Sequence, residues 1–245
     1  MNSSTSGTVT GGIDTGGLLG EVFEDVTIRT STSVSTVTGA NGTGGLVGFA
    51  GGSTVIDTTF ATGAVTGEVF VGGLVGLLNN SSVVDSGAGG DVTGVLGVGG
   101  LVGQLEIVST IDSSAALGAV TGEDIVGGLV GSIQQDTAIT NTFATGQVTA
   151  TDTGTGGGLV GASGGLGSGS DITNSFATGA IGVDGAFVGA SASTTYVENH
   201  FVSDTIMDAF GSDNGGNTGL ATDITGGALS DLQSATAPGL SLIHI

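Results

Sequence analysis

The sequence has no cysteine, no lysine and no tryptophan, and it has one arginine (Arg29) and one proline. Without cysteine, disulfide bonds and thiolate metal sites are excluded. The arginine stands against 22 acidic residues, and the resulting net charge of −21 repels nucleic acid and anionic lipid. The scarcity of cations also argues against sites for phosphates, nucleotides and acidic sugars. We therefore expect no nucleic-acid partner.

Long apolar runs are missing as well. No apolar stretch approaches the roughly 18 residues that a membrane-spanning helix needs, so we expect no membrane insertion. Residues 1–6 lack the positive and apolar regions of a signal peptide. Secretion therefore requires a longer parent chain, and we expect this sequence to be a fragment of one.

Glycine, by contrast, is abundant, with 52 residues, and 38% of the chain is apolar. Runs such as Gly156–Gly158 break the every-third-residue rule of collagen. The apolar content is too high for a disordered chain. Leu, Val and Ile are spread evenly, which favours many short strands.

Three apolar anchors recur along the chain. The first is the Leu of a Gly-Gly-Leu-Val-Gly block: Leu18, Leu46, Leu74, Leu101, Leu129, Leu159, with Phe187 in a degenerate copy. The second is Ile28, Ile56, Val84, Ile111, Ile139, Ile172 and Val197. The third, in Val-Thr-Gly or its variants, is Val9, Val37, Val65, Val92, Val120, Val148 and Ile181.

In most coils the anchors are ten, nine and nine residues apart, which gives a period of 28. A period of about 20 to 50 residues is typical of solenoids, and Gly and Thr interrupt the chain too often for helices. We predict an all-β fold: a parallel β-solenoid of about seven coils, three-sided and right-handed.

Strand alternation predicts which side chains point inward. Leu46 is expected inside and Val47 outside, with the glycines beside them at positive φ or in close contact with the next coil. Phe60 shares the parity of Ile56, so the column of Phe60, Phe143, Phe176 and Phe201 is expected in the core. A polar step precedes that column at Thr58, Ser86, Ser113, Asn141, Asn174 and Asn199, where Asn side chains are expected to stack.

The repeat ends near residue 202, so we divide the chain into three parts. Residues 1–202 form the solenoid. Residues 203–239 are an irregular C-terminal flank or cap, with loop over 203–219 and a short helix predicted at 228–235. Residues 240–245 resemble a translated sequencing adapter, and we expect them to be an assembly artefact.

The signature block, at a period near 28, resembles the GLUG-motif repeat of bacteria and archaea. It is intact at 44–48, 72–76, 99–103, 127–131 and 157–161, and nearly so at 16–20. The resemblance implies an adhesin-like segment of a larger secreted or cell-surface protein, and it carries over no catalytic residue. The implied partners are glycans or proteins of a host or neighbouring cell.

A search for catalytic and metal-binding residues gives few candidates. His200 is the one histidine outside the suspect tail, and it stands at a slot that other coils fill with Ser or Thr. Asp57, Asp85 and Asp112 are expected in one column, where stacked carboxylates would repel unless Ca²⁺ relieved the repulsion. Further candidates for Ca²⁺ are the loops 21–25 and 208–213.

We predict no enzyme activity, no catalytic residue and no required cofactor, with Ca²⁺ at most a modest stabiliser. The alternative is a carbohydrate-active β-helix enzyme or a polysaccharide-binding module, since a glycosidase needs two suitably spaced carboxylates. Arg29 and Tyr196 are thin support for a site that recognises acidic or aromatic-stacked sugars.

Overall fold

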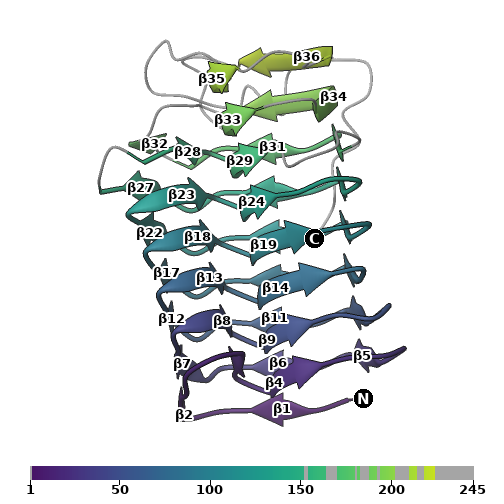
Figure 1. The fold of residues 1–245 in the computed structure, drawn as a ribbon, viewed down its shortest axis with the longest axis vertical. Coiled ribbons are helices and arrows are strands. Elements are labelled where there is room, and N and C mark those ends of the chain that lie inside the picture. Colours follow the sequence, from purple (N-terminus) through teal and green to yellow (C-terminus); the bar gives the residue numbers. More distant parts are fainter. Residues whose placement is uncertain are drawn as a thin grey trace.

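The structure is a computed structural model that describes residues 2–151, 154–163, 170–179, 181–182, 188–191, 194–201, 210–213 and 218–223, with side chains to residue 179 and at 188–189. Strands are its only regular elements, and all their pairings are parallel, as in β10 with β15 and β12 with β17. The coils stack into a rod with the N-terminus at one end (Figure 1). The prediction of a parallel β-solenoid is confirmed. No helix in the described part is long and apolar enough to cross a membrane.

Each coil from β5 to β29 contributes five short strands to four sheets. Sheet A holds two columns. The first is β5 (Thr27–Arg29), β10 (Val55–Asp57), β15 (Ser82–Val84), β20 (Thr110–Asp112), β25 (Ala138–Thr140) and β30 (Ser170–Thr173). The second is β1 (Ser4–Thr5), β6 (Thr32–Ser33), β11 (Phe60–Ala61), β16 (Gly87–Ala88), β21 (Ala115–Ala116), β26 (Phe143–Ala144) and β31 (Phe176–Ala177). The long strand β34 (Thr194–Phe201) pairs with both columns, and β36 (Thr218–Asp223) pairs with β34.

Sheet B consists of β2 (Thr8–Thr10), β7 (Thr36–Thr38), β12 (Val65–Thr66), β17 (Val92–Thr93), β22 (Val120–Gly122), β27 (Val148–Ala150) and β32 (Ile181–Gly182). Sheet C consists of β3 (Thr15–Gly16), β8 (Asn41–Gly44), β13 (Val69–Gly72), β18 (Leu96–Gly99), β23 (Asp124–Gly127) and β28 (Gly156–Gly157). Sheet D consists of β4 (Leu19–Val22), β9 (Val47–Ala50), β14 (Val75–Asn79), β19 (Val102–Glu106), β24 (Val130–Ile133), β29 (Val160–Ser163), β33 (Val188–Ser191) and β35 (Phe210–Asp213).

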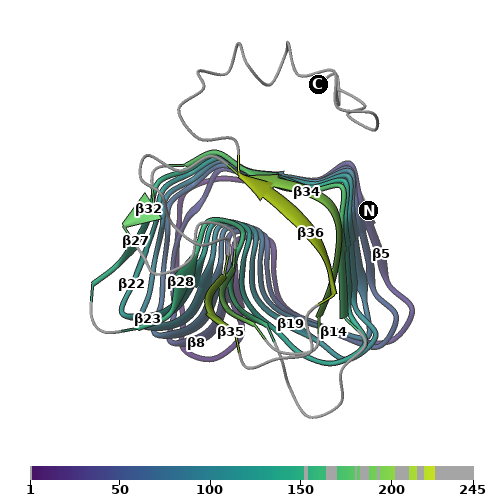
Figure 2. The same cartoon turned by 90° about the horizontal axis from the view of Figure 1, so that it is seen from above.

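The cross-section differs from the predicted triangle. Seen along the axis, the chain folds inward between sheets C and D instead of following the outside (Figure 2). The same view looks down from the C-terminal end, and the chain runs counter-clockwise as it rises, so the solenoid is right-handed. The inward fold adds a side to the coil, which explains four sheets where three were expected.

The signature block forms this inward fold. In the second coil, Leu46 lies at the bend between β8 and β9, and both Leu46 and Val47 are fully buried. The expectation that Val47 points outward is therefore wrong. Strand alternation fails here because the fold surrounds the block with other segments of the coil, so neither face meets solvent.

Close packing explains the glycines of the block. A Cβ atom on Gly44 would lie 2.7 Å from the backbone nitrogen of Gly76 in the next coil and would also collide with the carbonyl oxygen of Val47. The predicted close approach of coils is confirmed. The positive φ is not, since the positive-φ glycines of the described part are Gly7, Gly42, Gly52 and Gly97.

The inward fold also divides the core in two. The larger cluster lies between sheets A and D and contains the Leu anchors, the Ile anchors and an inward Ala column. The smaller cluster lies between sheets B and C. It joins the Val of Val-Thr-Gly to a second valine of the same coil, such as Val65 and Val71. The third-anchor column is confirmed in register, with Val65 paired to Val37 and Val92.

The second-anchor column needs two corrections. In the last of these coils, Tyr196 and not Val197 pairs with Ile172, so the anchor predicted at Val197 is wrong by one residue. Ile56 pairs with Val83, and Val83 pairs with Ile111, so Val83 and not Val84 is the buried anchor. This coil is one residue short, and the missing residue belongs to the turn between β14 and β15. Two adjacent valines made the two alignments indistinguishable by residue type.

Part of the predicted flank continues the stack. Strands β35 and β36 lie within residues 203–239 and pair in parallel with β33 and β34. The loop predicted over 203–219 is therefore wrong at residues 210–213 and 218–219. The helix predicted at 228–235 and the tail at 240–245 lie outside the described residues.

Candidate functional site

A left-handed corner separates the two strand columns of sheet A. One residue per coil has φ between 48° and 55° there: Thr30, Thr58, Asp85, Ser113, Asn141 and Asn174. Short polar side chains tolerate this conformation because they bond locally to the backbone. The predicted polar step is confirmed at four of these positions, while in the short coil Asp85 takes the place expected for Ser86. In β34, His200 pairs with Phe176, so Asn199 falls one position beyond the step.

A buried hydroxyl residue follows each corner. The Ser86 hydroxyl accepts hydrogen bonds from the Thr59 backbone N–H (3.0 Å) and donates to the Val84 carbonyl (2.7 Å). The Ser86 N–H in turn donates to the Ser114 hydroxyl at 3.1 Å, and Thr142 repeats the pattern with Ser175. This ladder satisfies the backbone that the corner removes from the sheet. The sequence signal is the Ser or Thr that precedes each Phe-Ala pair, which the three-anchor pattern does not single out.

After the corner, the side chains that face outward are not those that strand alternation predicts. Phe60 is 48% exposed, Phe143 and Phe176 are half-buried, and the residue after each of them is a fully buried alanine. The prediction of an interior Phe column is therefore wrong, because the left-handed corner and the buried hydroxyl residue shift the parity of Phe60 relative to Ile56. Phe201 does not belong to the column either, since it pairs with Ala177 and His200 pairs with Phe176. The rings of Phe143 and Phe176 stack on the outer face, with centroids 5.1 Å apart and planes at 6°.

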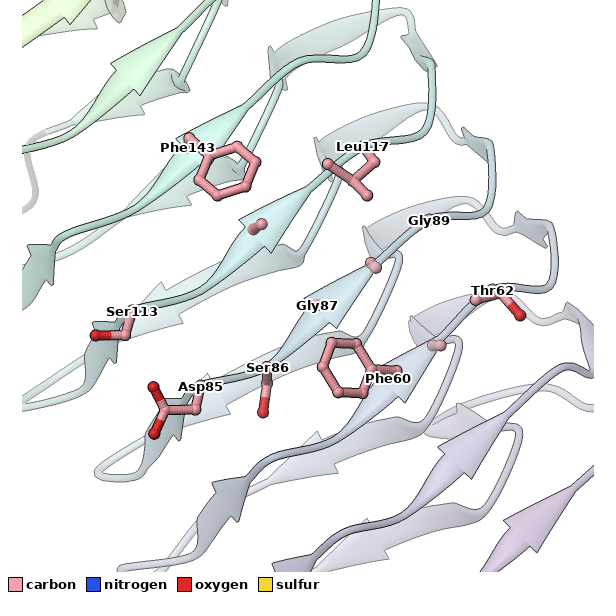
Figure 3. Close-up of a pocket in the computed structure, with 12 residues that line it drawn as sticks. Phe60, Thr62, Asp85, Ser86, Gly87, Gly89, Ser113, Leu117 and Phe143 are labelled. Carbon is pink, nitrogen blue, oxygen red and sulfur yellow. The ribbon is translucent and has the colours of Figure 1, made fainter. Parts of the chain in front are cut away.

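Two coils interrupt this outer aromatic column. Phe60 pairs with Gly87, Gly87 with Ala115, and Ala115 with Phe143, so two small residues lie between two phenylalanines. The gap is a hollow of about 330 Å³ on the outer face of sheet A, hereafter the groove (Figure 3). Gly87 and Ala115 form its floor, and the rings of Phe60 and Phe143 stand on its two sides along the axis.

Polar groups lie beside the groove on the corner side. Asp85 and Ser113 line it there, and Leu117 and Thr62 line it on the opposite side. Further along the same corner, Asn174 donates a hydrogen bond to Asn141 (2.6 Å), and Asn141 donates to Asp112 (2.9 Å). The predicted stacking of Asn side chains is confirmed by this chain of bonds.

The predicted acid column does not form. Asp57 and Asp112 share a column, but Val84 lies between them, and Asp85 belongs to the corner column instead. Asp57 pairs with Arg29 at 3.0 Å and accepts a hydrogen bond from the Thr58 hydroxyl at 2.7 Å. The carboxylate repulsion that motivated a Ca²⁺ site in this column is therefore absent, because the one-residue deletion displaces Asp85.

The other candidates are spread over the molecule. Near the loop 21–25, burial and the charge of Glu21 raise the pKa of Asp14. Across the part of the chain that is described, no three His, Cys, Asp or Glu side chains gather where they could hold a metal ion. His200 lies in β34 opposite Phe176, and Tyr196 lies opposite Ile172. The side chains of these two residues and of 210–213, and the whole of residues 208–209, lie outside the description.

The geometry defines a class: a right-handed parallel β-solenoid, in which a 28-residue coil stacks in register with its neighbours. The family model of the GLUG motif matches residues 124–149, which run from β23 through the signature at 127–131 to β27. The chain thus carries a GLUG-motif repeat in that coil, as its sequence indicated. No curated protein matches the chain.

Proposed function

We propose that this segment is a non-catalytic structural and adhesive module of an extracellular or cell-surface protein. Its coils form a rod whose length grows by about 4.8 Å with each coil added. The observation that carries the proposal is the groove, where Phe60 and Leu117 line the hollow and are each about half exposed. Exposed apolar side chains gathered at one hollow are typical of contact surfaces.

The lining of the groove favours contact over catalysis. A glycosidase places two carboxylates about the scissile bond. Asp85 is the single carboxylate among the described residues that line the groove, and Asp57 is paired with Arg29. A surface that binds glycans or proteins of a neighbouring cell needs no such pair.

The test measures adhesion and turnover on the same material. Beads coated with the full chain are incubated with cells and with immobilised polysaccharides, and retention is compared with that of uncoated beads. Product release from the same polysaccharides is followed in parallel. Retention without product release is expected. Product release that Asp85→Asn abolishes would overturn the proposal and establish an enzyme.

A further inference from the structure

We propose that the groove is a subsite for one uncharged pyranose unit of a neutral glycan. This inference rests on the adhesive function proposed above and names the chemistry that the adhesive surface recognises.

The apolar surfaces of the groove suit the two faces of a sugar ring. Phe143 has Phe176 stacked on one face, so its other face is left toward the hollow. Phe60 leans across the floor from the other side, since a Cβ atom added to Gly87 would lie 3.2 Å from its ring. Aromatic faces pack against apolar C–H surfaces in such an arrangement. Because the Phe60 ring lies over Gly87, the open part of the floor is at Ala115, and a sugar ring would lie there between the two phenylalanines.

The polar groups lie where the edge of the sugar ring would be. Asp85 and Ser113 line the corner side of the groove, and their backbone N–H groups are already bonded to Asp112 and Thr140 of the next coil. Within the described residues, neither side chain makes a hydrogen bond. A carboxylate accepts hydrogen bonds from hydroxyl groups, and such charge-assisted bonds are stronger than neutral ones.

The charge of the surface selects the ligand. Asp85 lines the groove, and Arg29, the one cation of the chain, is bound to Asp57 two coils from Ser113. An acidic sugar would bring a second negative charge next to Asp85 without a cation to offset it. A volume of about 330 Å³ lies at the lower end of the roughly 300–1,000 Å³ of small-molecule sites, which suits a single ring and its substituents.

The test uses the full chain and a substitution that fills the groove. Ala115→Phe adds a ring at a position where three other coils carry one, so the fold is expected to tolerate it. Thr93→Phe is the matched control, since Thr93 is exposed on β17 of sheet B, away from the groove. Binding of neutral hexose and N-acetylhexosamine oligosaccharides, of oligogalacturonate and of a phenylalanine-containing peptide is measured by saturation-transfer NMR and calorimetry.

We expect a neutral oligosaccharide to bind, and Ala115→Phe and Phe60→Ala to weaken it by about tenfold or more while Thr93→Phe leaves it unchanged. Equal binding of oligogalacturonate, or binding of the peptide alone, would overturn the inference. So would neutral binding that Ala115→Phe does not affect. If bead retention persists while no neutral sugar binds, the subsite is wrong and the adhesive function stands; if beads are not retained at all, the adhesive function fails first.

Discussion

Replacing Gly100 with alanine tests the idea that the coils are held at contact distance by glycine. Gly100 belongs to the signature block at 99–103, and an added Cβ would lie 2.9 Å from the Cβ of Ala116 and would also collide with the carbonyl oxygen of Gly128 in the next coil. Backbone atoms in a stacked sheet cannot move aside singly, so the coils must separate locally. Overpacking of this kind costs about 1–3 kcal/mol, and we expect the upper end of that range.

Gly89→Ala is the matched control in the preceding coil. The nearest atom to its added Cβ is a Thr62 methyl carbon at 3.8 Å, and Gly89 is not among the positive-φ residues. A compatible glycine-to-alanine change stabilises by about 0.4–1 kcal/mol because it restricts the unfolded chain. The two variants should therefore differ by about 3 kcal/mol or more.

Urea unfolding followed by circular dichroism gives the comparison. The free energy of unfolding is taken from transitions with equal slopes, because a changed slope would signal that the stack no longer unfolds as one unit. If Gly100→Ala proves as stable as Gly89→Ala, the contact between coils is not what requires glycine in the signature block.

Three further outcomes are expected. Ser86→Ala removes the acceptor of the Thr59 N–H and should lower the free energy of unfolding by about 1–3 kcal/mol in urea titrations, whereas an unchanged value would mean that the hydroxyl ladder is dispensable. Asp14 has its pKa raised above 3.8 by burial and by Glu21, so the folded chain holds that proton more tightly than the unfolded one. Stability from this group should fall as the pH rises through the raised pKa, and Asp14→Asn should flatten that part of the pH profile measured by thermal unfolding. CaCl₂ should raise the melting temperature no more than NaCl of equal ionic strength, since screening of a −21 charge suffices; a clear excess in CaCl₂ would reveal a specific site.

The sequence alone was sufficient for the stacking and for most of the core. Leu46, Ile56 and Val65 repeat at fixed distances, and identical residues in register can come only from coils that lie on one another. The strand pairings of Val65 with Val37 and Val92 follow directly from that repeat.

What the sequence could not give depends on the path of the chain within one coil. The burial of Val47 follows from an inward fold, which no periodicity encodes. The outward direction of Phe60 follows from the φ of 54° at Thr58, which changes the parity over a single residue. Asp85 was assigned to the wrong column because Val83 and Val84 are adjacent and chemically alike.

The groove could be predicted from the sequence only in part. Its signal is the pair of small residues Gly87 and Ala115 between Phe60 and Phe143 in one column. Without the corner geometry, that column was assigned to the core, where a small residue means a packing defect rather than a surface hollow.

The separation of the outer Phe60 column from the inner Ala61 column has a consequence for how such a surface can change. From β11 to β31 every coil keeps an alanine on the inside of this strand, while the outside carries a ring, a hydrogen or a methyl group, so the two sides of one strand vary independently. Duplication or loss of a whole coil would shift the aromatic walls along the rod in steps of about 4.8 Å without disturbing the interior. The number and order of the coils thus set the spacing of the contacts on this face.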